Sequence, residues 1–273
     1  MNPGPKTLNI KTRNPTPVIV CGHQRSGTTL LYLLLQSHRQ IELTREYNNF
    51  AWVNAPCRHY LNKLEKRHTR RIVIGAGTPR HPRIARWRDA RFKTRYVRAV
   101  HRYARPFVTI DVIAQSMGKA LRAADVVGDK YPDYVFKLDK FCAIDALKCI
   151  VIYRDVRDVA RSTLEKCRAE WRNRPFAAKM DSPEKIADRW AESVRTMRAH
   201  EDRLLAVKYE QLVQEPVATL ARIGEYLGVA PNGFKADIAQ PDRIGKYKDE
   251  LTVKQVDQLL YVAGDEMQAL GYA

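Results

Sequence analysis

The stretch VIVCGHQRSGTTLL, residues 18–31, decides the fold of this chain. An apolar run leads into a loop in which Gly22 and Gly27 enclose four residues, and a second apolar run follows. This spacing between a strand and a helix is typical of phosphate-binding loops, because backbone N–H groups and the helix dipole converge on one anion. Thr28 stands where an ATP-binding loop has its lysine, and the loop carries Arg25 instead. An arginine here can bridge a phosphate and a second anionic group, whereas a polyphosphate with magnesium would be poorly served.

Strand and helix patterns alternate along the rest of the chain. The alternation predicts one α/β domain of the P-loop type, with a central parallel sheet, helices on both faces, and ligands at the carboxyl ends of the strands. Strands are expected at 17–22, 125–130, 148–154 and 204–209, and helices at 27–37, 83–105, 110–124, 155–167, from 182 to at least 197, 215–228 and 252–270.

Positive charge is concentrated in one segment. The 273 residues carry a net charge of +18, and residues 58–105 hold sixteen Lys or Arg against two acids, a local charge of +14. Such a segment attracts an anion, which could be a nucleic acid, a membrane surface or an acidic substrate. The alternative is a solvated, arginine-rich helical face. We therefore treat 50–110 as a basic helical insert on the acceptor side of the domain.

The composition also suggests a cellular compartment. The five cysteines are odd in number and form no C-x-x-C pair, which favours neither a disulfide framework nor a zinc site. No apolar run approaches the ~20 residues that cross a bilayer. Residues 1–16 lack the apolar stretch of a secretory signal and are expected to form a flexible N-terminal arm before a domain at 17–273. A reduced, cytoplasmic protein is expected.

The loop RSGTTLL after a strand resembles the 5′-phosphosulfate loop of sulfotransferases that use 3′-phosphoadenosine 5′-phosphosulfate (PAPS) as the sulfuryl donor. The resemblance implies that the 5′ end of PAPS is held by the loop residues Arg25, Ser26, Gly27, Thr28 and Thr29.

A second stretch, VIYRDVRDVARS at 151–162, resembles the 3′-phosphate motif of the same family. The resemblance implies that Arg154 and Ser162 clasp the 3′-phosphate. Ser162 should lie two turns into a helix that Asp155 opens, so its hydroxyl can face the pocket at the end of the strand. The alternative is a surface serine beside a structural arginine that pairs with Asp158.

Three further stretches resemble the tyrosylprotein, Golgi-type and bacterial branch of the family. GDKYP at 128–132 implies that Lys130 stabilises charge on the sulfuryl group and the leaving phosphate. VKYEQLVQEP at 207–216 implies that Tyr209 lies against the nucleotide, although a buried structural tyrosine is the alternative. DRIGKYKDEL at 242–251 resembles a segment that folds over the cofactor, with Arg243, Gly245 and Lys246 as candidates. Residues 50–110 match no motif.

The resemblance also implies a general base. In the tyrosylprotein branch a glutamate follows the loop arginine by twenty-one residues, which leads here to Glu46. Glu46 could instead form a surface pair with Arg45. Cytosolic family members use a histidine base, and His23, His81 and His101 leave that alternative open, although none of them matches it securely.

Taken together, these motifs imply an enzyme that transfers a sulfuryl group from PAPS to an acceptor hydroxyl by in-line displacement, without a metal. The basic insert favours an anionic carbohydrate or glycoconjugate as acceptor. A tyrosine, a small-molecule or lipid hydroxyl, and a peripheral membrane contact are the alternatives. A P-loop kinase lacks its lysine here, and a nucleic-acid-binding protein, which the arginines alone would allow, is not expected. The oligomeric state is not specified by the sequence.

Overall fold

The computed structural model describes residues 14–65, 82–121 and 124–272. The expected N-terminal arm therefore lies almost entirely outside the described residues, as does 66–81 of the basic insert. That residues 17–273 form a single domain stays a prediction.

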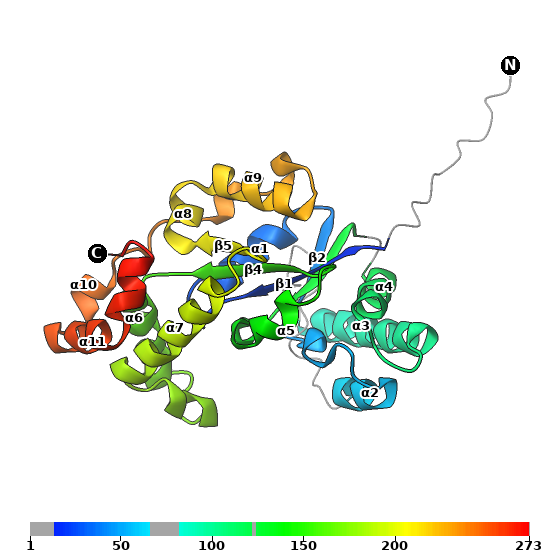
Figure 1. Ribbon diagram of the computed structural model, residues 1–273, viewed down its shortest axis with the longest axis horizontal. Helices are drawn as coiled ribbons and strands as arrows, with labels where there is room; N and C mark the ends of the chain where they lie inside the picture. Colours follow the sequence, from blue (N-terminus) through cyan, green and yellow to red (C-terminus); the bar gives the residue numbers. More distant parts are fainter. Residues whose placement is uncertain (1–13, 66–81, 122–123, 273) are drawn as a thin grey trace, which may run out of the picture.

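In the described residues the core of the molecule is a five-stranded, all-parallel sheet with the strand order β2-β3-β1-β4-β5 (Figure 1). The strands are β1 Thr16–Cys21, β2 Ile41–Arg45, β3 Val126–Lys130, β4 Lys148–Tyr153 and β5 Leu205–Lys208. The central β1 places Val18 opposite Gly128 on one side and Lys148 on the other. The predicted parallel sheet is confirmed. Because the winding direction reverses at β1, the crevice outside its carboxyl end is the expected ligand position.

Helices pack on both sides of the sheet, as predicted. The longer helices are α1 Thr28–Gln36, α2 Cys57–Glu65, α3 Pro82–Tyr103, α4 Ile110–Ala120, α6 Val156–Arg168, α7 Pro183–Arg198, α9 Pro216–Leu227 and α11 Val253–Ala269. The shorter ones are α5 Leu138–Cys142, α8 Tyr209–Gln214 and α10 Tyr247–Glu250, and 3₁₀ turns include η1 Asn49–Trp52, η3 Pro132–Lys137 and η4 Pro175–Lys179.

Alternation along β1 divides the core into two layers. Val18 and Val20 belong to a cluster with α1, α8 and α9. Ile19 and Cys21 belong to a cluster with α2, α3, α4 and α5 on the opposite face. Successive side chains of a strand point to opposite faces, so a strand that is apolar throughout is buried on both sides. A third cluster joins α6, α7 and α11 around the fully buried Trp190.

One strand was not predicted. β2 has only five residues, IELTR, and two of them are charged, so its sequence does not stand out as a strand. Ile41, Leu43 and Thr44 are nevertheless buried, and β2 pairs in parallel with β3 at the edge of the sheet. This strand ends immediately before Glu46, the predicted base.

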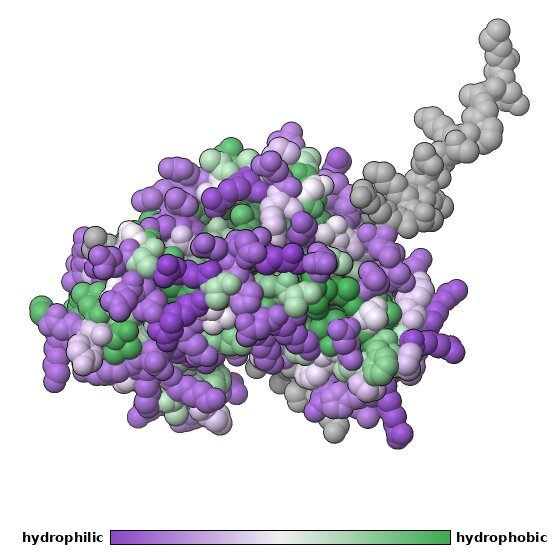
Figure 2. All heavy atoms as spheres, in the orientation of Figure 1, coloured by the Kyte–Doolittle hydropathy of each residue, from purple (hydrophilic) through white to green (hydrophobic). Residues whose placement is uncertain are grey.

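The surface is mainly polar. The face shown in Figure 2 is largely hydrophilic, with an apolar patch at its left end. The exposed large hydrophobic residues of the chain include Val253 and Leu260 of α11. No helix within the described ranges is long and apolar enough to cross a membrane.

Candidate active site

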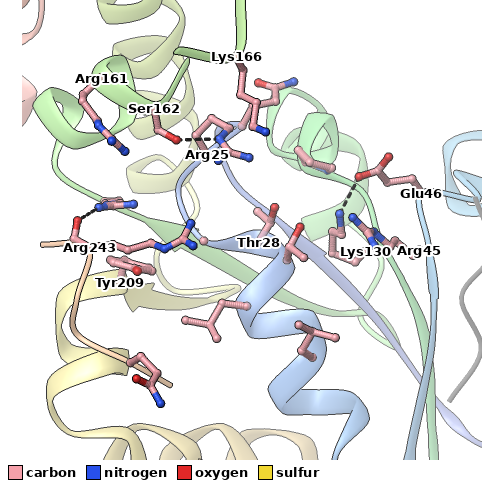
Figure 3. A pocket seen from close by; sticks show the side chains of 18 of the residues that line it. Arg25, Thr28, Arg45, Glu46, Lys130, Arg161, Ser162, Lys166, Tyr209 and Arg243 are labelled. Atoms are coloured by element: carbon pink, nitrogen blue, oxygen red, sulfur yellow. Dashed lines mark hydrogen bonds and ion pairs between the residues drawn. The ribbon is translucent and has the colours of Figure 1, made fainter. Parts of the chain in front are cut away.

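The carboxyl end of each described strand supplies one side chain to a single cavity of about 790 Å³. Arg25 follows β1, Glu46 follows β2, Lys130 ends β3, Arg154 follows β4 and Tyr209 follows β5. Parallel strands end at the same edge of a sheet, so these five residues, far apart in sequence, become neighbours. Ligands are expected at the carboxyl ends of the strands, and this cavity lies there. We therefore take it as the candidate active site (Figure 3).

The cavity is strongly cationic. Among the described residues, the positive side chains that line it are Arg25, Arg45, Lys130, Arg154, Arg161, Lys166 and Arg243, and the negative ones are Glu46, Glu170 and Asp242. Figure 3 shows the labelled cations around Thr28, with Lys130 and Arg45 beside Glu46 on one side and Arg243 beside Tyr209 on the other. A cavity with this excess of positive charge is suited to a ligand with several negative charges.

The glycines of the loop are required by close packing. Gly22 has a φ of 144°, and a Cβ there would lie 2.1 Å from the carbonyl oxygen of Ile152. Gly27 has a φ of 98°, and a Cβ there would lie 2.5 Å from a ring carbon of Tyr209. Both positions combine a backbone conformation that favours glycine with no room for a side chain. The phosphate loop is therefore packed directly against β4 and against Tyr209.

The loop presents its free amides to the cavity. Helix α1 begins at Thr28, and the first amides of a helix have no partner inside it, so the amides of Thr28 and Thr29 are available to an anion. The amide of Ser26, by contrast, donates to the carbonyl of His23 at 3.1 Å and closes the loop. Ser26 is fully buried and does not line the cavity, and its hydroxyl oxygen has no hydrogen-bond partner among the described residues.

Arg25 spans the space between the loop and α6. Its Nε donates to the Ser162 hydroxyl at 3.0 Å (Figure 3). Burial lowers the pKa of Arg25, and the nearby Arg243 and Arg154 lower it further. A guanidinium among other cations is stabilised by any anion that binds between them. The structure thus brings the predicted 5′-side arginine together with the predicted 3′-side serine.

Arg154 is almost fully buried and holds several contacts at once. Its guanidinium lies 4.2 Å from the centre of the Tyr209 ring, pairs with Asp158 at 3.1 Å, and donates to the carbonyl of Arg243. The ion pair with Asp158 that the alternative interpretation predicted is therefore present. The same arginine also lines the cavity, and its Nε is buried without a partner among the described residues. This N–H group is therefore free to donate a hydrogen bond to a phosphate oxygen.

Glu46 and Lys130 form an ion pair at the other side of the cavity, with Nζ and Oε1 2.7 Å apart. The Lys130 side chain is 1% exposed and that of Glu46 is 29% exposed. Burial lowers the pKa of Lys130, and the negative charge of Glu46 opposes that effect. The amide of Glu46 also donates to the carbonyl of Lys130 at 2.7 Å. The predicted base and the predicted sulfuryl-contacting lysine, 84 residues apart, are thus direct neighbours.

Two predicted C-terminal residues lie outside this cavity. The Gly245 amide donates to Asp158 at 2.8 Å, and Gly245 borders a second cavity of about 340 Å³. Lys246 is exposed and precedes α10. Arg243 does line the main cavity, so the C-terminal segment reaches the site through that residue and its neighbours.

The histidines that were candidate bases are placed elsewhere. His23 is buried, its Nδ1 lies 2.7 Å from the carbonyl oxygen of Gln24, and burial lowers its pKa to about 4. His101 is exposed on α3, and His81 lies outside the described residues. Neither His23 nor His101 borders the cavity, so Glu46 is the better-placed candidate.

Several residues of the cavity were missed by sequence reasoning. They are the loop residue Gln24, the charged residues Arg161, Glu170 and Asp242, and the largely apolar group Leu30, Leu33, Pro132, Trp171, Ile238 and Gln240. Arg161 directly precedes the motif residue Ser162, and this adjacency could have predicted its place in the cavity. The apolar group carries no motif and is assembled only by the fold.

No cluster of three or more potential metal ligands from His, Cys, Asp and Glu occurs in the part of the chain that the structure describes. The five cysteines are all free thiols. That the reaction needs no metal stays a prediction.

A glycine loop at the head of a parallel sheet, opening onto a cationic cavity, defines a P-loop-type α/β protein built to hold an anionic ligand. The model of the sulfotransferase family matches residues 17–232, most of the chain. The chain therefore belongs to the sulfotransferase family, as the motifs predicted. The comparison with curated proteins gave no match.

Solved structures support the same fold. The sulfotransferase domain of the olefin synthase from Synechococcus PCC 7002 is 18% identical, with a TM-score of 0.54 over 93% of this chain and 96% of that one. Sulfotransferase STF9 from Mycobacterium avium is 14% identical, with a TM-score of 0.53 over 96% of this chain and 78% of that one. The sulfotransferase domain from the curacin biosynthetic pathway is 14% identical, with a TM-score of 0.51 over 96% and 99%.

Proposed function

We propose that this protein transfers a sulfuryl group from PAPS to a hydroxyl of an anionic acceptor, a carbohydrate or glycoconjugate. The observation that carries the proposal is the arrangement of the cavity. Lys130 and Glu46 pair on one side of the cavity, Arg25 meets Ser162 on another, and Thr28 lies between these pairs (Figure 3). Arg154 lines the same cationic space.

The two groups fit the two anionic ends of PAPS. The free amides of Thr28 and Thr29 would hold the 5′-phosphate at the start of α1. Arg154 and Ser162 would hold the 3′-phosphate, and the unpartnered Nε of Arg154 supports this assignment. Tyr209 and the apolar group of the cavity would pack against the nucleoside. The Arg25–Ser162 contact supports a position for Arg25 between these two ends, where its guanidinium would reach both.

The chemistry needs one proton acceptor and compensation of charge. PAPS supplies the sulfuryl group. Glu46 would take the proton of the acceptor hydroxyl as its oxygen bonds to sulfur, and the bond between sulfur and the 5′-phosphate oxygen breaks, leaving adenosine 3′,5′-bisphosphate. Lys130 and Arg25 would stabilise the negative charge on the sulfuryl oxygens and the departing phosphate. The Lys130–Glu46 pair keeps the base and the cation in contact before the acceptor arrives.

The basic insert supports an anionic acceptor. Helix α3 exposes Arg88, Arg91 and Arg98, and Phe92 on its buried side meets Tyr47 edge-on with ring centres 5.6 Å apart. Tyr47 directly follows Glu46, so the positive helix adjoins the turn that carries the proposed base. A tyrosine or a lipid hydroxyl is the second acceptor class, and a peripheral membrane contact would use the same helix. We also propose a cytoplasmic location, which the cysteine pattern favours.

The test is transfer of labelled sulfate from PAPS across a panel of acidic and neutral glycans, lipids, phenols and tyrosine peptides. We expect transfer that is greatest on an acidic glycan, is independent of added magnesium and falls by about 10²- to 10⁴-fold in Glu46→Gln. Transfer confined to tyrosine peptides or lipids would replace the acceptor assignment.

Two other outcomes would replace the activity itself. Protection against heating by ATP with Mg²⁺, but not by adenosine 3′,5′-bisphosphate, would favour a kinase. Steeply salt-dependent binding to nucleic acid without any response to PAPS would favour a nucleic-acid-binding protein.

A further inference from the structure

The carboxylate of Asp129 is completely buried one residue before Lys130, and the function proposed above does not use it. It accepts hydrogen bonds from the Thr44 hydroxyl at 2.7 Å, the Tyr47 amide at 3.1 Å, the Asn48 amide at 2.7 Å and the Tyr134 hydroxyl at 2.9 Å. Burial raises the pKa of Asp129, and these donors act against that effect. A carboxylate has about four acceptor positions, so its hydrogen-bonding capacity is used up by these contacts.

The turn that Asp129 holds is the one that carries Glu46. Glu46 and Asn48 both have a φ of 60°, which lies in the left-handed region that residues other than glycine rarely adopt. Such a turn persists only where surrounding contacts fix it. The bonds from Tyr47 and Asn48 to Asp129, and the bond from the Glu46 amide to the Lys130 carbonyl, are those contacts.

The end of β3 therefore fixes this turn twice. Asp129 and Lys130 are consecutive in a strand, so their side chains point to opposite faces of the sheet. The Asp129 side chain binds the backbone of the turn, while the Lys130 side chain binds the carboxylate of Glu46. The position of the carboxylate in the cavity depends on both.

We propose that Asp129 is a positioning residue, which places Glu46 for proton transfer by holding the 46–48 turn. This inference rests on the proposed role of Glu46 as the base. In Asp129→Asn one acceptor oxygen becomes a donor, so two of the four groups that bonded Asp129 face a donor instead. Displacing a catalytic group by about 1 Å costs up to ~100-fold in rate. We therefore expect Asp129→Asn to lower kcat by about 10- to 100-fold.

The experiment is a double-mutant cycle of Asp129→Asn and Glu46→Gln, with kcat measured by labelled-sulfate transfer and affinity for adenosine 3′,5′-bisphosphate measured by calorimetry. We expect Asp129→Asn to change nucleotide affinity less than about twofold. We also expect it to cause no further loss of kcat in the Glu46→Gln background. Asp125→Asn is the matched control: it makes the same change on an exposed aspartate just before the start of β3, and it should behave as the wild type.

Several results would overturn the inference. Losses that multiply across the cycle would show that Asp129 acts independently of Glu46, as would a parallel loss of nucleotide affinity. Wild-type kcat in Asp129→Asn would exclude the role directly. Wild-type turnover in Glu46→Gln would remove the base assignment, and this inference with it. If Asp129→Asn does not fold, Tyr134→Phe and Thr44→Val each remove one donor. Their loss of kcat must then vanish in the Glu46→Gln background, and multiplying losses would refute the role.

Discussion

At the scale of single residues, the site is defined by charges that neutralise one another incompletely. Lys130 is matched by Glu46, and Arg154 is matched in part by Asp158. Burial lowers the pKa of Arg25, and its Nε donates to a neutral hydroxyl, that of Ser162. Among the described residues, no carboxylate lies within ion-pair distance of Arg25. The free energy of anion binding should therefore depend most on the arginines, and each can be tested separately.

Arg25→Ala should lower turnover by about 100-fold or more, the usual effect of removing a donor that stabilises transition-state charge. The measurement is kcat with saturating PAPS. Because Arg25 also contacts Ser162, calorimetry with the bisphosphate product should show a loss of affinity as well. A purified variant with wild-type turnover would contradict the catalytic assignment.

Arg154→Ala should weaken binding of adenosine 3′,5′-bisphosphate by about 2–5 kcal/mol, the range for truncating one partner of a desolvated charge pair. Calorimetry gives the value directly. Arg198→Ala on α7, an exposed arginine that does not line the cavity, is the control and should leave affinity unchanged. Equal affinity in both variants would exclude Arg154 as the 3′-phosphate ligand.

At the scale of elements, the site depends on how strands end and helices begin. The loop between β1 and α1 was predictable, because its glycines and its following apolar helix are local signals. The turn after β2 was predictable only by resemblance, since β2 is short and carries Glu42 and Arg45. The pairing of Lys130 with Glu46 depends on the strand order, which no local pattern encodes. β2 pairs with β3, and the paired residues are 85 positions apart in the sequence.

Gly27→Ala should destabilise the protein by about 2–6 kcal/mol, since a positive φ costs about 1–3 kcal/mol and overpacking adds a similar amount. The added methyl would meet the Tyr209 ring, so nucleotide affinity should fall together with stability. Urea unfolding gives the first quantity and calorimetry the second. Gly264→Ala in α11, where a Cβ meets nothing within 4 Å, is the control and should retain stability and affinity.

His23 should make the loop sensitive to acid. Its pKa is lowered by burial from 6.5 to about 4, so the unfolded chain binds a proton between these values while the folded protein does not. Its contribution is present above about pH 6.5 and is lost as the pH falls towards 4, by on the order of 3 kcal/mol. Urea unfolding between pH 7 and pH 4.5 should show a shallower decline in His23→Gln. Identical slopes would contradict this.

At the scale of the whole molecule, charge is distributed unevenly. The basic segment and the cationic cavity adjoin one another through the packing of Tyr47 on Phe92 and Tyr96. Figure 1 shows α2 and α3 together on one side of the sheet, away from α10 and α11. A field of this kind would raise the local concentration of the proposed anionic acceptor near the proposed base, without changing the chemistry itself.

Removing exposed arginines from α3 should therefore affect acceptor capture alone. At about 0.2–1 kcal/mol for each exposed charge, Arg88→Ser, Arg98→Ser and Arg102→Ser together should raise KM for an anionic acceptor by about 3- to 150-fold at low salt. The difference should shrink at higher salt, and PAPS affinity should not change. The control is a triple variant of exposed residues on α7, with Lys185→Ser, Arg195→Ser and Arg198→Ser, which removes the same amount of positive charge from another part of the surface. Equal effects of the two triples would contradict local recruitment.

The strand order also bears on the routes of the two substrates. β2 and β5 are the outer strands, roughly 19 Å apart at about 4.8 Å for each neighbouring pair. Glu46 follows one and Tyr209 follows the other, so a donor lying across the strand ends has its reactive group and its purine at opposite margins of the sheet. Acceptor traffic should then pass β2 while spent nucleotide leaves past β5. If the proposed donor and acceptor follow these routes, neither exchange has to wait for the other.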